Sequence, residues 1–323
     1  MNYGPRVLSV FFDSGYLFPT LVMLYSAHET MNPNVEFVLG TFKGELRQED
    51  KKNISKILES MNRNFTFIEI SKGELASKAE GIDLKAHFGH AALGKIEILH
   101  KIPQRHIYSD VDVIFMEGFD SEAEKLDNSS MAGFVPQAAA LKNSHLDTDD
   151  KNQEFFSGFI VWPTQDNRPL IEIDESSLWV TKYSTHDQAF LNHRLGRHYL
   201  QLSPAFCQLD NPKLLNSDYG PGIVHYFGNW KPWHAWKMNR TLCCSTACSW
   251  SIWFSRETKS LELAQQLNIT GWWRRKRIRA IRGASPNLKR LQLAMLSSRL
   301  LLPKSVTRKI LRKSFGTRYH LIH

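Results

Sequence analysis

Apolar runs and amphipathic stretches alternate along the first part of the chain. The run from Arg6 to Phe12 (RVLSVFF) is apolar almost throughout, which is typical of a strand buried on both faces of a sheet. Between Lys51 and Met61, apolar residues recur at the spacing of one helix face. The same reading predicts strands at residues 6–12, 35–39 and 65–70 and helices at residues 16–28 and 51–61.

Strands that alternate with helices of these lengths favour one fold class. A strand, a covering helix and a returning strand form a right-handed crossover, so successive strands become parallel neighbours. We therefore predict an α/β fold with a Rossmann-like, mainly parallel sheet and flanking helices. After Trp236 the composition becomes rich in Cys, Ser and Trp and then strongly basic. This change predicts an α/β domain of the nucleotide-binding type at residues 1–236 and a Trp-rich, basic helical region at residues 237–323.

Length and composition exclude several classes of protein. With 323 residues, 42% of them hydrophobic and 23% charged, the chain can bury a large core and is neither disordered nor membrane-spanning in composition. Four Cys residues are too few for a disulfide scaffold. Cys243, Cys244 and Cys248 lie close together without a second ligand pair, so we interpret them as reduced thiols.

The charge of the chain is divided unequally along its length. Of 41 Lys and Arg residues, 15 lie in residues 271–323, which contain no Asp or Glu. The other 26, with 32 Asp and Glu, give residues 1–270 a net charge of −6 within a total of +9. A basic segment of this kind usually meets phosphate, either in a nucleic acid or at an anionic membrane surface.

The hydrophobic pattern of this basic segment favours a membrane. Ser285 and Pro286 form a helix start, and leucines follow at helical spacing among Lys and Arg residues. We interpret the nearby Trp250, Trp253, Trp272 and Trp273 as interfacial anchors. We expect residues 271–323 to bind an anionic membrane surface, and nucleic acid to be the less favoured partner. The N-terminus lacks a secretion-signal pattern, so we expect a cytoplasmic protein, peripheral on the inner face of the cell membrane.

Two segments carry candidate chemistry. Asp110 and Asp112 follow the apolar residues of a predicted strand, and side chains two residues apart face the same side of extended backbone. Paired carboxylates repel each other unless a cation lies between them, and oxygen ligands suit magnesium or manganese. Farther along, His225 offers an imidazole ligand, Gly228 allows backbone amides to approach a phosphate, and Lys231 offers a positive charge for a leaving diphosphate.

These segments occur in the order typical of glycosyltransferase family 8, and the chain resembles this family of retaining nucleotide-sugar glycosyltransferases with the GT-A fold. The resemblance covers roughly residues 6–236. The segments that carry it are residues 12–16 (FDSGY), Lys95, residues 110–112 (DVD), residues 156–161 (FSGFIV), residues 186–192 (HDQAFLN) and residues 225–233 (HYFGNWKPW).

The resemblance implies a reaction and a set of roles. The reaction is metal-dependent transfer of a hexose from a UDP-sugar to a glycan or glycolipid acceptor of the lipopolysaccharide type, with retention at the anomeric carbon. Implied ligands of Mn²⁺ or Mg²⁺ are Asp110, Asp112 and His225. Implied contacts of the UDP-sugar are Asp13, Tyr16, Lys95, Asp110, Val111, Gly228 and Lys231. Asp187 and Gln188 are the implied catalytic residues beside the anomeric carbon.

Two departures from the family pattern leave the transferred sugar and the acceptor geometry open. Phe156 stands where the family has Asn, and residues around Pro136 and Gln137 stand where an Asp often holds the donor sugar. Two other functions therefore stay open: a catalytically impaired family member that acts as a binding module, and a nucleic-acid-binding protein that uses the basic tail.

Several candidate residues also have structural interpretations. Asp13 is a typical turn residue, Asp187 and Gln188 can cap a helix, and a glycine such as Gly158 permits close strand packing. Tyr16 and Lys95 can be an ordinary helix-start aromatic and a solvated lysine. Trp233 and Trp236 either line an acceptor pocket or pack in the core.

Overall fold

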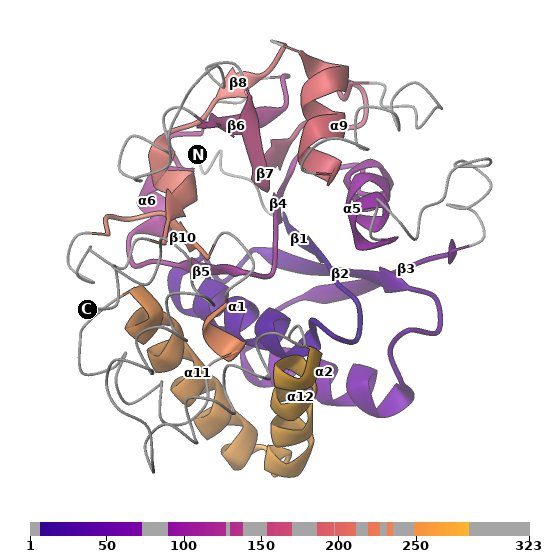
Figure 1. The fold of residues 1–323 in the computed structure, drawn as a ribbon, viewed down its shortest axis with the longest axis vertical. Coiled ribbons are helices and arrows are strands. Elements are labelled where there is room, and N and C mark those ends of the chain that lie inside the picture. The colour runs from indigo at the N-terminus through magenta and orange to yellow at the C-terminus, as the bar shows by residue number, and fades with distance from the viewer. Residues whose placement is uncertain are drawn as a thin grey trace, which may run out of the picture.

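The computed structural model describes residues 7–72, 90–126, 130–137, 154–169, 186–196, 198–210, 219–226, 231–234 and 249–283. Within these ranges a seven-stranded sheet is covered by helices on both faces (Figure 1). The predicted α/β class with a mainly parallel sheet is confirmed. No helix in the described ranges combines the length and hydropathy needed to cross a membrane.

The main sheet contains one parallel half and one mixed half. Its strand order is β3-β2-β1-β4-β7-β6-β8. The strands are β1 (Val7–Phe11), β2 (Glu36–Phe42), β3 (Phe65–Ile70), β4 (His106–Ser109), β6 (Gly133–Pro136), β7 (Phe155–Trp162) and β8 (Leu200–Gln201). Strands β3, β2, β1 and β4 are parallel, whereas β7 runs antiparallel to β4 and to β6. Candidate site residues follow β1 and β4, where the carboxyl ends of parallel strands meet.

The helices predicted near the N-terminus are confirmed, with small shifts at their ends. They are α1 (Leu17–Thr30) and α2 (Gln48–Ser60). The other described helices are α5 (His90–Lys101), α6 (Phe119–Ala123), α9 (His186–Leu195), α11 (Ser249–Gln266) and α12 (Thr270–Gly283), with 3₁₀ turns η1 (Pro204–Cys207) and η3 (Pro232–His234). Figure 1 shows α5 and α9 on one side of the main sheet and α1, α2, α11 and α12 on the other.

A smaller sheet positions the second half of the candidate site. It consists of β5 (Val113–Phe115), β10 (Ile223–His225) and β9 (Gln208–Leu209), in the order β5-β10-β9. Strand β10 runs antiparallel to β5, with His225 opposite Val113. Since β5 begins one residue after Asp112, this register brings His225 beside the two aspartates.

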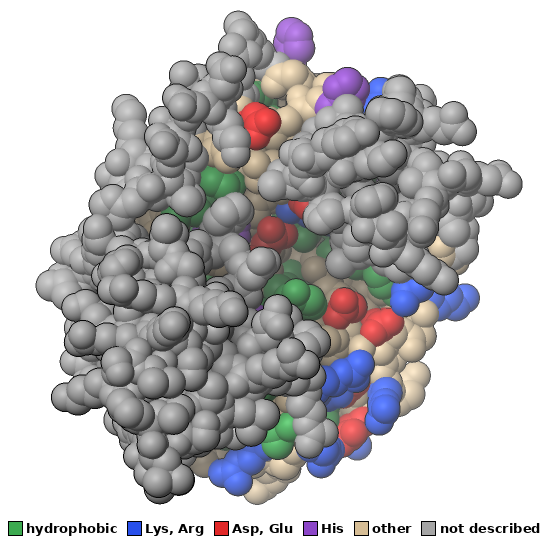
Figure 2. Space-filling view, in the orientation of Figure 1, with side chains coloured by type: hydrophobic (Ala, Val, Ile, Leu, Met, Phe, Trp, Pro, Cys, Tyr) green, Lys and Arg blue, Asp and Glu red, His purple; other side chains and the backbone are tan. Residues whose placement is uncertain are grey.

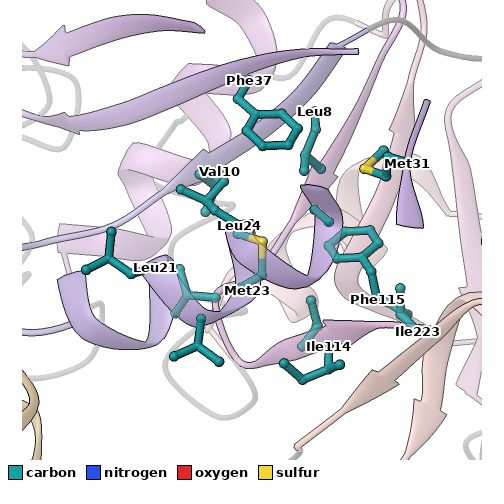
Figure 3. Close-up of a cluster of buried hydrophobic side chains, with 14 of the residues drawn as sticks. Leu8, Val10, Leu21, Met23, Leu24, Met31, Phe37, Ile114, Phe115 and Ile223 are labelled. Atoms are coloured by element: carbon teal, nitrogen blue, oxygen red, sulfur yellow. The ribbon is translucent and has the colours of Figure 1, made fainter. Parts of the chain in front are cut away.

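The principal core lies between the main sheet and the smaller sheet. Figure 3 shows Leu8 and Val10 of β1 facing Leu24 of α1, with Ile114 and Phe115 of β5 on the other side of the helix. All five of these side chains are almost completely buried. Helix α1 is thus enclosed on several sides, and this explains why its sequence is apolar on more than one face.

The described C-terminal helices pack on the rest of the protein, and this corrects one interpretation made from the sequence. Helices α11 and α12 pack on α1, and Trp253, Trp272 and Trp273 are buried in the principal core. The indole of Trp272 donates to Asp50 Oδ1 at 2.8 Å. Rings held in this way are unavailable as membrane anchors, so that interpretation is wrong for these three residues. Residues 249–283 also share their core with residues before 236.

The basic residues of α12 are largely engaged within the protein. Lys276 pairs with the buried Asp50, Arg275 with Glu49 at 2.6 Å, and Arg277 with Glu257 at 2.5 Å. The acidic body and the first part of the basic segment therefore neutralise each other, because docking α12 places opposite charges in contact. The predicted helix that starts at Ser285 lies outside the described residues, as do Cys243, Cys244 and Cys248.

Candidate functional site

Two carboxylates and one imidazole converge between the two sheets. Asp110 and Asp112 lie in the link from β4 to β5, and His225 ends β10. One ligand atom from each of the three lies within 4.8 Å of the others. The backbone N–H of Tyr226 donates to the carbonyl of Asp112 at 2.9 Å, which holds the two segments together. Two carboxylate oxygens and one imidazole nitrogen at this spacing are suitable ligand atoms for a divalent cation.

The positive charges around Asp112 keep its carboxylate ionised. Asp112 pairs with the ammonium of Lys231 and lies 3.3 Å from His225 Nε2. Burial opposes ionisation of Asp112, but Lys231 and His225 outweigh it and hold the pKa of Asp112 well below its usual range. Burial also disfavours a charged imidazole, yet Asp112 raises the pKa of His225 to about 10. A cation bound here would replace the His225 proton, because only neutral imidazole is a ligand.

The His225 ring is confined on two further sides. A Cβ added to Gly158 of β7 would lie 2.6 Å from His225 Cε1, so only glycine leaves room for the ring. The buried thiol of Cys207 lies 3.7 Å from His225 Nδ1, which is the ring nitrogen that faces away from Asp112. No local sequence pattern singles out Cys207, because its contact with His225 depends on the pairing of β9 with β10.

Lys95 joins the metal-binding and catalytic candidates. Its ammonium lies 3.0 Å from Asp110 Oδ1 and 2.8 Å from Asp187 Oδ2, and the residue is only 3% exposed. Ser157 Oγ donates to the same Asp187 oxygen at 2.8 Å. Burial lowers the pKa of Lys95, but the two carboxylates outweigh burial and raise that pKa overall. The interpretation of Lys95 as an ordinary solvated lysine is therefore wrong.

Asp187 reaches Lys95 because α9 is docked on β7. Asn192 Oδ1 accepts from the backbone N–H of Phe155 at 2.9 Å, and Asn192 Nδ2 donates to the carbonyl of Phe155 at 3.1 Å. Asp187 lies in the first turn of α9, where a carboxylate also suits the helix dipole. Asp187 therefore lies at the start of a helix and also belongs to the candidate site, so both interpretations apply to it. Gln188, next to it, is buried.

The loop after β1 brings Asp13 and Tyr16 toward the acidic pair. Asp13 Oδ1 accepts from the backbone N–H groups of Gly15 at 2.7 Å and Tyr16 at 3.1 Å, so Asp13 does form a turn. Tyr16 is 46% exposed and meets the Trp233 ring edge-on, with 6.4 Å between centroids. Partial burial, followed by the charges of Asp112, Asp13 and Asp110, raises the pKa of Tyr16. The Tyr16 ring therefore lies within the field of the acidic pair.

The remaining candidates fall into three groups. Val111 is buried between the two aspartates, and Lys231 also donates to the carbonyl of Tyr226. Trp233 is buried against Trp253, with 4.9 Å between ring centroids, in accordance with the core interpretation. Gly228 and Trp236 lie outside the described residues. Among the departures from the family pattern, Phe156 packs in the core and Gln137 is buried at the end of β6.

Figure 2 shows the face of the molecule seen in Figure 1. Asp and Glu side chains lie toward its middle, and a group of Lys and Arg side chains lies toward its lower right edge.

Solved structures with the same fold are glycosyltransferases. The galactosyltransferase LgtC, in complex with donor and acceptor sugar analogues, aligns with a TM-score of 0.57 and 16% identity over 84% of this chain and 99% of that one. The WbbM bifunctional glycosyltransferase aligns with a TM-score of 0.54 and 13% identity over 82% of this chain. This chain covers 52% of WbbM, about half of its length. At these identities the likeness shows the fold alone.

The sequence itself establishes the family. No curated protein matches the chain. Residues 7–237, however, match the model of Glycosyl transferase family 8, and this match covers well over half of the chain. The protein therefore belongs to glycosyl transferase family 8 and is a glycosyltransferase.

Proposed function

We propose that the protein transfers a hexose from a UDP-sugar to a glycan or glycolipid acceptor of the lipopolysaccharide type, with retention at the anomeric carbon and with Mn²⁺ or Mg²⁺ as cofactor. The observation that carries the proposal is the convergence of Asp110, Asp112 and His225, with Lys231 against Asp112. Family membership supports the transfer reaction, and LgtC, a galactosyltransferase of the same fold, supports a hexose donor.

Asp110, Asp112 and His225 would hold the cation, which would act as a Lewis acid toward the donor diphosphate. Lys231 lies beside this cluster and supplies a fixed positive charge for the phosphate that leaves. Because Lys231 is held by the Tyr226 carbonyl as well as by Asp112, its ammonium stays in place when a cation takes over the carboxylate.

The sugar end of the site is assigned to Asp187 and Lys95. Lys95 holds the Asp187 carboxylate beside Asp110, and Ser157 donates to the same carboxylate and orients it. A fixed carboxylate there would stabilise positive charge at the anomeric carbon in the transition state. We assign the nucleoside to Asp13 and Tyr16, since their loop lies at the carboxyl end of β1, the usual place for a nucleotide in such sheets.

The test is a screen of UDP-sugars read by UDP release, with Mn²⁺, with Mg²⁺ and with neither. We expect one donor to be slowly hydrolysed in the presence of metal. Asp112→Asn should reduce turnover at least about 100-fold, because the metal loses a charged ligand. Glu49→Gln, on the exposed side of α2, is the matched carboxylate control and should retain activity. Metal-independent turnover in folded Asp110→Asn and Asp112→Asn proteins would refute the proposed mechanism.

A second candidate is a family member that binds UDP without transferring a sugar. Phe156 favours it, because a core phenylalanine stands at a position that is polar in the family. UDP binding with Mn²⁺ and no turnover for any donor or acceptor would support this alternative.

We also propose that the protein is peripheral on the inner face of the cell membrane. Since three cations of α12 pair within the body, the proposal rests mainly on the nine Lys and Arg residues that follow position 283. Aliphatic residues recur at helical spacing among these Lys and Arg residues, and this pattern favours anionic lipid over nucleic acid as the partner.

A further inference from the structure

A cation of the last described helix reaches the loop assigned to the nucleoside. Arg279 of α12 donates from Nη2 to Ser14 Oγ at 2.8 Å, across 265 positions of sequence. Ser14 is only 5% exposed and lies between Asp13 and Tyr16. Arg279 lies outside residues 7–237, which match the family model, so this contact comes from a part of the chain that the family pattern does not cover.

Ser14 relays this contact to a second loop. Its hydroxyl accepts from Arg279 and donates to Glu45 Oε1, and its backbone N–H reaches the same oxygen at 3.3 Å. Glu45 follows β2 and pairs with Lys72, which follows β3, at 3.2 Å. The hydrogen bond from Ser14 is the main reason that the pKa of Glu45 is lowered. Arg279 thus lies at one end of a series of linked polar and charged side chains that passes the carboxyl ends of β1, β2 and β3.

The loop after β1 depends on such external contacts. The bonds from Gly15 and Tyr16 to Asp13 lie within the loop and shape its turn, but they do not fix the turn relative to the rest of the site. Ser14 supplies polar contacts that reach other elements, through Glu45 and Arg279. Charge-assisted hydrogen bonds of this kind are stronger than neutral ones.

Helix α12 is itself firmly placed. Trp272, Trp273 and Ala280 are buried, and Lys276 pairs with the buried Asp50. Helix α12 also contacts η3, which contains Trp233, the partner of the Tyr16 ring. The helix that delivers the Arg279 guanidinium therefore has little freedom relative to the site.

We propose that Arg279 is a positioning residue for the nucleoside part of the donor. It holds Ser14, so that Asp13 and Tyr16 are pre-arranged beside the acidic pair before the donor arrives. The proposal rests on the proposed function as far as the donor is concerned. The ordering of the loop is a property of the protein alone.

The kinetic test compares Arg279→Met with Arg275→Met. Arg275 lies one turn earlier on the same helix and pairs with the exposed Glu49, so it controls for loss of a cation from α12. We expect Arg279→Met to raise KM for the UDP-sugar roughly tenfold with kcat nearly unchanged, because a preorganised binding loop is lost before the chemical step. Arg275→Met should leave both constants unchanged, and Arg279→Lys should restore part of the donor affinity. Arg279→Met should add little in the Ser14→Ala background, because the hydroxyl that Arg279 contacts is already absent there.

Hydrogen exchange tests the ordering of the loop without any donor. The amides of Gly15 and Tyr16 should exchange several-fold faster in Arg279→Met than in the wild type and in Arg275→Met. If no UDP-sugar is turned over by the wild type, the proposed function fails while this measurement still decides the role of Arg279. Unchanged exchange at Gly15 and Tyr16 would overturn the inference, as would equal effects of the two Arg variants on exchange.

Discussion

At the scale of single residues, Gly158 determines whether His225 can face the acidic pair. From the sequence, its lack of a side chain was interpreted as room for a neighbouring strand. The structure shows that the room is taken by the imidazole ring, whose Cε1 would lie 2.6 Å from a Cβ at this position. Cys207 and Asp112 confine the same ring from other directions, so it has little space to retreat.

We predict that Gly158→Ala weakens the binding of Mn²⁺. The added methyl group must displace the ring, and a displaced metal ligand typically costs about 10- to 100-fold in affinity. A Mn²⁺ titration followed by electron paramagnetic resonance measures this directly. Gly271→Ala is the matched control, because a Cβ there meets only the Arg275 guanidinium at 3.8 Å. Equal Mn²⁺ affinity in Gly158→Ala and the wild type would contradict the prediction.

At the scale of elements, β4 carries the acidic pair at its end and a buried histidine at its start. His106 is completely buried, and its Nδ1–H donates to the carbonyl of Gln104 at 2.9 Å. Burial is the main reason that the pKa of His106 falls from 6.5 to about 4. The folded strand therefore holds a neutral imidazole at pH values where the unfolded chain is already protonated.

This difference predicts a loss of stability in acid. Between pH 6.5 and 4 the unfolded chain binds more protons than the folded protein, so the free energy of unfolding falls as the pH falls. His106 contributes at most on the order of 3 kcal/mol to this fall, which is complete below pH 4. Urea unfolding at pH 7.5, 6 and 5 measures it. In His106→Asn the free energy of unfolding should fall less steeply as the pH is lowered. If the free energy of unfolding depended on pH equally in the variant and the wild type, the acid sensitivity would belong to His28 and His234, whose pKa values are also lowered.

At the scale of the whole molecule, part of the positive charge of the basic segment is paired within the fold. Lys276, Arg277 and Arg275 bind acidic residues of the folded body and fasten α12. The Lys and Arg residues after position 283 are those to which we assign a membrane surface.

We predict that the protein co-sediments with vesicles containing anionic lipid and not with neutral vesicles. The triple variant Lys289→Gln, Arg290→Gln, Arg299→Gln should bind about 100-fold more weakly, since each cation near an anionic surface contributes about 1 kcal/mol. The triple variant Arg275→Gln, Arg274→Gln, Lys259→Gln removes equal charge from the body and should bind nearly as the wild type does. Stronger binding to DNA than to anionic vesicles at matched salt would favour the nucleic-acid alternative.

Local patterns in the sequence predict the elements near the N-terminus and the candidate metal ligands that follow β4. The strand predicted at residues 65–70 coincides with β3, and Asp110 and Asp112 share one side, as their spacing required. Local periodicity suffices for such features, because burial on one face repeats every two residues in a strand and every 3.6 in a helix. The order of the family segments adds His225 and Lys231 to the predicted site.

Which distant residues meet depends on the fold as a whole. The antiparallel register of β10 against β5 places His225 next to Asp112, and the docking of α9 brings Asp187 to Lys95. Trp272 and Trp273, adjacent to a basic run, have the local pattern of membrane anchors, yet they complete the core under α12. The contact of Arg279 with Ser14 has no local signal at all. Such pairings depend on how whole helices and strands bury their apolar faces against one another, and no short stretch of sequence contains that information.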